Sequence, residues 1–151
     1  MIKKVPKILV VDDDVNTCGT LSLILRKRGW NVEIANNGKE AINKSREQLF
    51  NVALLDIKLP DIDGTQLLKM LYETKPKMMK IMVTGHPEVT NAVEALNNGA
   101  DAYLIKPLCP EDLLKTIKEK LDEQEQAEEM TEDKITSFLE TRSKKLLEGL
   151  T

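Results

Sequence analysis

The chain has 151 residues, of which 41% are hydrophobic and 31% charged. This composition is typical of a globular protein, and the length suffices to bury a core. Its apolar runs are much shorter than the roughly 18 to 20 residues that a membrane-spanning helix needs. The apolar run at residues 8–11 leads directly into three aspartates, which argues against a signal peptide. We therefore expect a cytoplasmic protein that contacts no membrane.

Charge is distributed unevenly along the chain. Residues 1–121 carry 18 basic and 16 acidic side chains, whereas residues 122–151 carry 4 basic and 9 acidic ones. A nucleic-acid-binding surface needs clustered lysine and arginine side chains to neutralise phosphates. The acidic C-terminal segment therefore argues against direct nucleic-acid binding by this chain.

Five short apolar runs alternate with amphipathic stretches. The runs are rich in Val, Ile and Leu, as buried parallel strands are. Apolar residues at helical spacing predict helices after each run, and the fifth helix begins near Pro110. The strands are expected at residues 7–11, 32–35, 52–55, 80–84 and 102–105, and the helices at 15–28, 38–48, 64–73, 88–98 and from 110 onwards.

The alternation predicts one α/β domain over residues 1–121. Repeated strand–helix units form a doubly wound parallel sheet, here with five strands flanked by five helices. Such sheets bind ligands at the carboxyl ends of their strands. The residues that follow each strand are therefore the candidates for a functional site.

Acidic side chains, one hydroxyl and one ammonium stand at the ends of four predicted strands. Clustered carboxylates repel one another unless a cation neutralises them, and an all-oxygen set suits Mg²⁺. The hydroxyl and the ammonium could then bind phosphoryl oxygens. One of the acids, Asp14, is better explained as a helix N-cap. The residues are Asp12, Asp13, Asp14, Asp56, Thr84 and Lys106.

These motifs resemble those of the receiver domain of two-component response regulators. The resemblance covers about residues 5–121 and rests on VVDDD, LLDIKLPDIDG, VTGH and GADAYLIKP. It implies a CheY-like sheet with strand order 2-1-3-4-5. It also implies a signalling switch in which a sensor histidine kinase or a phosphotransfer protein phosphorylates Asp56. Such a chain is no enzyme beyond its own phosphorylation and dephosphorylation.

The resemblance also assigns the metal ligands. Asp13 and Asp56 would bind Mg²⁺ directly, together with the backbone carbonyl of Lys58. Asp12 would act largely through water. His86, two residues past Thr84, is the position that the family links to phosphoryl lifetime, although a solvent-facing loop residue is the simpler interpretation.

The remaining roles concern phosphoryl binding and signal output. Thr84 and Lys106 would contact phosphoryl oxygens, with Gly85 leaving the site accessible and the Lys106–Pro107 peptide bond expected to be cis. Thr84 and Tyr103 would form the switch, in which Tyr103 turns inward on phosphorylation. The output face would consist of the helix at 88–98, the strand at 102–105 and the fifth helix.

A different phosphoryl-transfer chemistry is the remote alternative. The string DIDGT at residues 61–65 matches the DxDGT motif of haloacid-dehalogenase-type phosphatases, in which Asp61 would be the nucleophile. In that family the motif directly follows an apolar strand, whereas here Pro60 precedes it and the apolar run ends at Asp56. Turn formation and capping explain Asp61 and Asp63 without catalysis.

The C-terminal 30 residues are less conventional. Residues 122–129 are almost wholly polar and predict an acidic linker or a solvated helical extension. Residues 131–149 predict an amphipathic helix, with acids leading and lysines trailing. Arg142 interrupts its stripe, and two repeats are too few to assert a coiled coil. The apolar positions are Ile135, Phe138, Leu139, Leu146 and Leu147.

Several roles remain open for this tail. The helix could fold back on the receiver domain, bind a partner, or form a homodimer together with the fifth helix. The chain could also be the N-terminal receiver and linker of a longer DNA-binding or ATPase response regulator.

Overall fold

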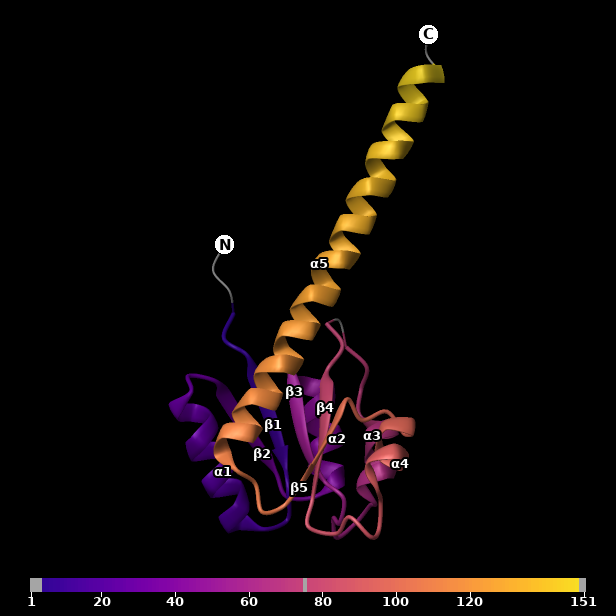
Figure 1. The fold of residues 1–151 in the computed structure, drawn as a ribbon. Coiled ribbons are helices and arrows are strands. Elements are labelled where there is room, and N and C mark those ends of the chain that lie inside the picture. The colour runs from indigo at the N-terminus through magenta and orange to yellow at the C-terminus, as the bar shows by residue number, and fades with distance from the viewer. Residues whose placement is uncertain (1–3, 75, 150–151) are drawn as a thin grey trace.

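A computed structural model describes residues 4–74 and 76–149. Five parallel strands form one sheet in the order β2-β1-β3-β4-β5, which confirms the expected fold class and strand order. Figure 1 shows helices on both faces of the sheet and one long helix that projects from the domain. The elements are β1 (Lys7–Val11), α1 (Val15–Lys27), β2 (Asn31–Ala35), α2 (Gly38–Glu47), β3 (Val52–Asp56), α3 (Gly64–Met70), β4 (Met79–Thr84), α4 (Ala92–Asn97), β5 (Ala102–Ile105) and α5 (Pro110–Gly149).

Each face of the sheet has its own hydrophobic core. Successive strand residues point to opposite faces. Leu9 of β1 belongs to the cluster that includes Leu67 of α3. Its neighbour Ile8 belongs to the other cluster, with Leu25 of α1 and Ile117 of α5. Burial on both faces explains why the central strands are apolar almost throughout.

The register of the strands brings the candidate residues to one edge of the sheet. Asp12 and Asp56 directly follow a pair of register partners on β1 and β3. Thr84 at the end of β4 is paired with Ile105 of β5, and Lys106 is the next residue. Because all five strands run in the same direction, their polar ends meet at one rim.

Gly64 allows α3 to begin close to the end of β3. A Cβ atom at this position would lie 2.4 Å from the Asp56 carbonyl oxygen and 2.7 Å from the Ile57 Cα atom. The Gly64 amide donates to the Ile57 carbonyl at 2.8 Å. Asp63 caps the helix by accepting a hydrogen bond from the Thr65 amide. The absence of a side chain at residue 64 therefore sets the distance between α3 and Asp56.

The third helix is shorter than expected. It ends at Met70, whereas the apolar pattern predicts a helix over 64–73. Lys80 of β4 is buried, and its ammonium donates to the Leu68 carbonyl at 2.8 Å. This bond satisfies one of the carbonyls that a helix leaves unpaired at its C-terminal end.

The fourth helix begins later than expected. It starts at Ala92 rather than at residue 88, because Asn91 caps it by accepting a hydrogen bond from the Glu94 amide. The helix packs against β5 through buried Ala95, while Val93 and Leu96 are 67% and 50% exposed. The apolar residues that mark this helix in the sequence therefore face outward.

The fifth helix runs without a break from Pro110 to Gly149. The polar stretch at residues 122–129 is thus a helical extension. Gln124 is its last buried residue: its side-chain amide donates to the carbonyls of Asn51 at 3.0 Å and Lys77 at 2.6 Å. Residues 126–149 are all exposed, and the helix points away from the domain instead of folding back on it (Figure 1).

None of the helices in the described residues combines the length and the apolar character that crossing a bilayer requires.

Replacing Gly64 with alanine should destabilise the domain. The new methyl group would overlap backbone atoms of Asp56 and Ile57, and overpacking of this kind costs about 1–3 kcal/mol. Gly19→Ala is the matched control, because Gly19 is exposed within α1 and nothing lies within 4 Å of a Cβ atom there. We expect that control to be neutral or stabilising by up to about 1 kcal/mol. Urea unfolding measures both; equal stability of the two variants would contradict this account of Gly64.

Candidate functional site

Three carboxylates converge at the carboxyl edge of the sheet. Asp12, Asp13 and Asp56 each offer one oxygen, and these oxygens lie within 4.8 Å of one another. Asp12 and Asp56 are buried, at 3% and 9% exposure, whereas Asp13 is exposed. Hard oxygen ligands open to water on one side fit a divalent cation such as Mg²⁺.

Lys106 extends from the end of β5 into this group of carboxylates. Its ammonium lies 2.8 Å from Asp12 Oδ2 and 3.5 Å from Asp56 Oδ2. Burial lowers the pKa of Lys106, but the hydrogen bond to Asp12 and the charge of Asp56 outweigh burial and raise the pKa overall. The peptide bond from Lys106 to Pro107 is cis, as expected.

Asp56 lies in an environment that disfavours its charge. Burial and the neighbouring Asp12 carboxylate raise the pKa of Asp56, although Lys106 and the Lys58 amide act in the opposite direction. That amide donates to Asp56 Oδ1 at 3.3 Å. One ammonium shared between two buried carboxylates compensates only part of their negative charge. The remaining negative charge would favour binding of a second cation.

Thr84 and Tyr103 hold opposite ends of the loop between β4 and α4. Thr84 is fully buried, and its hydroxyl oxygen accepts a hydrogen bond from the His86 amide at 2.8 Å. At the other end of the loop, the Tyr103 hydroxyl donates to the Thr90 carbonyl at 2.5 Å. Thr84 and Tyr103, the two residues predicted to form the switch, are thus both hydrogen-bonded to this loop.

The other aspartates near the site are helix caps. Asp14 is the N-cap of α1 and accepts from the Asn16 amide at 2.9 Å. Asp61 accepts from the amides of Gly38 and Lys39, at 2.8 and 2.9 Å, where α2 begins. These two hydrogen bonds lower the pKa of Asp61. The first aspartate of DIDGT thus anchors a helix that precedes it in the chain.

Two residues that the sequence does not single out hold the backbone of Asp12. The Asn36 side-chain amide and the Cys18 thiol both donate to the Asp12 carbonyl, each at 3.2 Å. Burial and the Asp12 carboxylate raise the pKa of Cys18 to about 11. The Cys18 thiol is therefore a neutral hydrogen-bond donor at pH 7. Asn36 reaches Asp12 from a separate loop, so no local sequence motif reveals its role.

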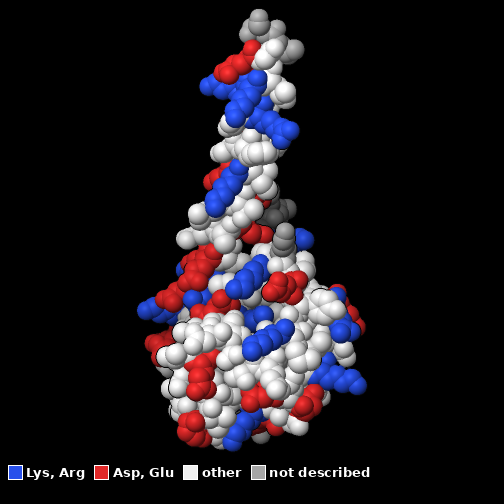
Figure 2. Space-filling view, turned by 90° about the vertical axis from the view of Figure 1, so that its right-hand side faces the viewer, with Lys and Arg blue, Asp and Glu red and all other residues white. Residues whose placement is uncertain are grey.

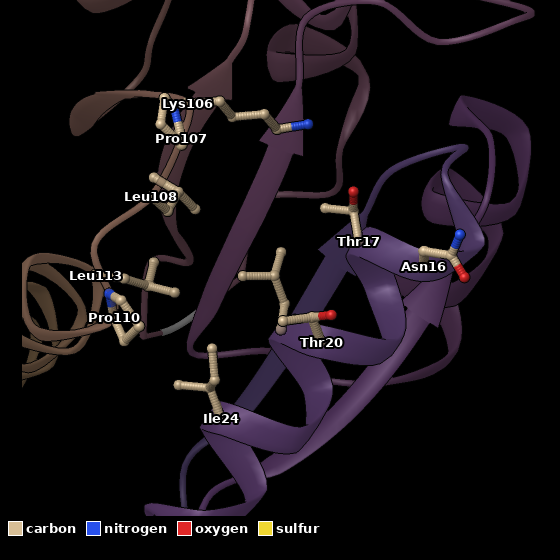
Figure 3. A pocket seen from close by; sticks show the side chains of 10 residues that line it. Asn16, Thr17, Thr20, Ile24, Lys106, Pro107, Leu108, Pro110 and Leu113 are labelled. Atoms are coloured by element: carbon tan, nitrogen blue, oxygen red, sulfur yellow. The ribbon is translucent and has the colours of Figure 1, made fainter.

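A pocket of about 640 Å³ opens beside Lys106, between α1 and the loop that joins β5 to α5. Figure 3 shows the ammonium of Lys106 at one end and Ile24 of α1 near the other. Leu108 and Leu113 form the wall opposite α1. The apolar pocket is thus continuous with the charged rim.

The fold and the site together define a class of protein, namely α/β signalling domains with an acidic site at the sheet's carboxyl edge. The family model for the response regulator receiver domain matches residues 8–118. The chain belongs to this family of two-component receiver domains.

Relatives and solved structures agree with this assignment. The transcriptional regulatory protein ZraR of Escherichia coli K12 is 41% identical over 114 residues, which cover 76% of this chain and 26% of ZraR. TrcR of Mycobacterium tuberculosis is 34% identical over 112 residues, covering 74% of this chain and 44% of TrcR. The chain thus matches between a quarter and a half of these regulators.

Among solved structures, a CheY-like receiver domain from Methanospirillum hungatei JF-1 superposes with a TM-score of 0.77 at 49% identity, covering 82% of this chain and 99% of that one. A Burkholderia pseudomallei response regulator, described as holding a phosphorylated aspartic acid and a calcium ion, has a TM-score of 0.70 at 33% identity, with 82% and 72% covered.

The raised pKa of Asp56 predicts a pH-dependent cost to stability in the metal-free protein. In the folded state the carboxyl keeps its proton to higher pH than in the unfolded chain, where its pKa is near 3.9. Stability contributed by Asp56 is therefore present at low pH and lost as pH rises through the folded-state pKa. In EDTA, the unfolding free energy of the wild type minus that of Asp56→Asn should fall as pH rises above the unfolded-state pKa near 3.9. A difference that rises with pH would contradict this cost.

Magnesium should stabilise the folded protein through the carboxylates. A ligand that binds only the folded state at ten times its Kd adds about 1.4 kcal/mol. We expect Mg²⁺ to raise the thermal midpoint of the wild type and to have little effect on Asp13→Asn. Asp122→Asn, which removes an exposed carboxylate on α5, is the matched control and should respond like the wild type. An equal response of all three proteins would place the cation elsewhere.

Proposed function

We propose that this chain is a phosphorylation-dependent signalling switch in which Asp56 accepts a phosphoryl group from a phosphohistidine. The donor would be a sensor histidine kinase or a phosphotransfer protein. The observation that supports this most strongly is the convergence of Asp12, Asp13 and Asp56 with the Lys106 ammonium at 2.8 and 3.5 Å from two of the carboxylates. Family membership and the phosphorylated aspartic acid of the Burkholderia structure support the same chemistry.

The proposed reaction is an in-line transfer to a carboxylate. An oxygen of Asp56 forms a bond to phosphorus while the nitrogen–phosphorus bond of the donor breaks and its electron pair returns to the imidazole. The product is an acyl phosphate. The switch would be reset by hydrolysis of the acyl phosphate. The oxygen of a water molecule forms a bond to phosphorus, and the bond between phosphorus and the Asp56 oxygen breaks. Phosphate is the only diffusible product, so the protein is a switch with self-directed chemistry rather than an enzyme.

The residues around Asp56 have complementary roles in this proposal. Asp12, Asp13, Asp56 and the backbone carbonyl of Lys58 would hold Mg²⁺. When bound, this ion neutralises negative charge on the phosphoryl oxygens. The carboxylate oxygens of the three aspartates are close enough to one another for a shared ion, so the donor set fits this role.

Lys106 and Thr84 would bind the transferred group. The Lys106 ammonium now contacts Asp12 and Asp56 and would turn toward a phosphoryl oxygen, where its charge compensates the added negative charge. The oxygen of Thr84 accepts from His86, which leaves its hydroxyl proton for a phosphoryl oxygen. Both residues would stabilise the transfer without a covalent step of their own.

Signal output would pass through the loop that joins Thr84 to Tyr103. Movement of Thr84 toward the phosphate would release or reposition Thr90, whose carbonyl now accepts from the Tyr103 hydroxyl. The face beside this loop, formed by α4, β5 and α5, already exposes Leu96 and Ile105 at 50% and 53%. Exposed apolar residues of this kind mark a surface for a protein partner.

The pocket beside Lys106 would receive the phosphoryl donor. A phosphohistidine must reach Asp56 from outside the domain, and the apolar walls of Ile24 and Leu108 adjoin the charged rim. Such walls suit the side chains that surround a donor histidine. We further propose a cytoplasmic location, which is consistent with membership of the response regulator receiver family.

A second candidate concerns the whole protein. The relatives are transcriptional regulatory proteins, and this chain matches only 26% of ZraR. The chain could therefore be the receiver and connecting helix of a longer DNA-binding or ATPase regulator. The reading frame downstream of Thr151 distinguishes a separate switch from such a regulator.

Acetyl phosphate with Mg²⁺ tests the proposed acceptor. We expect intact-mass measurement to show one added phosphoryl group on the wild type, and borohydride reduction followed by peptide mapping to locate it at Asp56. Asp56→Asn should abolish the modification. Asp61→Asn, which alters the competing aspartate, should keep it, although the amides of Gly38 and Lys39 then lose one of their two acceptor oxygens, which should lower stability by about 1 kcal/mol. Labelling at Asp61 would overturn the proposal and favour the phosphatase chemistry.

A further inference from the structure

The projecting part of α5 has an apolar stripe that nothing in the described structure covers. Ile135, Leu139 and Leu146 are 55%, 56% and 67% exposed, and Phe138 is 60% exposed. Residues three, four, seven and eleven positions apart lie on one face of a helix. Most of the stability of protein helices comes from packing of an apolar face rather than from intrinsic propensity. The stripe is therefore a candidate surface for a partner helix.

Charge along the projecting helix is strongly polarised. Residues 125–133 carry 5 acidic side chains and no basic one, whereas residues 134–149 carry 4 basic and 2 acidic ones. Figure 2 shows basic side chains on the outer part of the helix and acidic ones where it leaves the domain. Two such helices side by side in parallel would place acid against acid. An antiparallel pair would place the acidic half of each against the basic half of the other.

The seam of the helix supports the same orientation. Alternating steps of four and three residues connect Glu128, Glu132, Ile135, Leu139, Arg142 and Leu146, which is the seam spacing of paired helices. In an antiparallel pair of these helices centred at the level of Ser137, every seam residue lies opposite a seam residue of the other helix. Leu139 then lies opposite Ile135, Leu146 opposite Glu128, and Arg142 opposite Glu132. The arginine that interrupts the stripe thereby gains an acidic partner from the other chain.

The segment proposed for this pairing begins where α5 leaves the domain. The hydrogen bonds of Gln124 to Asn51 and Lys77 mark where α5 leaves the domain. In the register centred on Ser137, Gly149 of one helix lies opposite residue 125 of the other. The 25 residues from 125 to 149 would overlap along about 37 Å, which is the length of the described helix beyond Gln124.

We propose that residues 125–149 of α5 pair antiparallel with the same segment of a second copy of this chain, with the two-fold axis near Ser137. The pairing is independent of phosphorylation at Asp56. It would hold two receiver domains at opposite ends of a helical pair and leave both acidic sites open to their donors.

Charge reversal on the full chain tests the register. Without a phosphoryl donor, sedimentation equilibrium should show a monomer–dimer equilibrium. Glu132→Arg and Arg142→Glu should each weaken dimerisation by about tenfold, because each creates two like-charge contacts across the axis. The double variant should recover the wild-type dissociation constant to within about threefold. Asp133→Arg, one residue away from the seam, is the matched control and should change it by less than about threefold.

Spin labels determine the orientation independently. In a Cys109→Ser background, labels at Thr136→Cys, which flanks the seam beside the two-fold axis, should lie about 10 Å apart. Labels at Glu129→Cys should be about 24 Å apart along the axis, because residue 129 would lie opposite residue 145. Short distances at both positions would show a parallel pair and overturn the proposal. A strictly monomeric wild type would also overturn the proposal, as would a double variant that dimerises as weakly as the single variants. Neither result would affect acetyl phosphate labelling of Asp56, so failure of this pairing is distinguishable from failure of the proposed function.

Discussion

Repulsion between the buried carboxylates of Asp12 and Asp56 is the interaction on which the rest of the site depends. Parallel register places them on adjacent strand ends, and the Lys106 ammonium bridges them at 2.8 and 3.5 Å. Burial removes most of the water that would otherwise screen the two charges. The protein therefore keeps a costly cluster of negative charge that a cation can relieve. This only partly compensated charge supports the proposal of a metal-assisted phosphoryl acceptor.

The surrounding structure holds this cluster in place and connects it to the surface. Gly64 lets α3 start against the backbone of Asp56, while Asn36 and Cys18 fix the carbonyl of Asp12. On the other side, the loop after Thr84 is tied to Tyr103. In the proposed switch, a phosphoryl charge added at Asp56 would act on a loop whose two ends are held by these hydrogen bonds.

The sequence predicted the fold and the meeting of the polar strand ends at one edge for a physical reason. Strands that are buried on both faces consist of almost continuous apolar residues, which can be recognised in the sequence. The carboxyl ends of parallel strands all lie at one edge of the sheet, so the polar residues that follow them meet there. Contacts between distant residues away from this edge were not predictable. Asp61 caps a helix 22 residues earlier in the chain, and Gln124 bonds to a strand start 73 residues earlier. The late start of α4 depends on capping by Asn91, which competes with an apolar pattern that continues on both sides of it.

A crystal structure with Mg²⁺ and beryllofluoride tests the central account most directly. The account predicts a beryllofluoride adduct on Asp56, a cation held by the aspartates of the rim, and the Lys106 ammonium within hydrogen-bonding distance of a fluoride instead of Asp12. An adduct on Asp61, or an unmodified Asp56 with Lys106 still bound to Asp12 at saturating reagent, would contradict it.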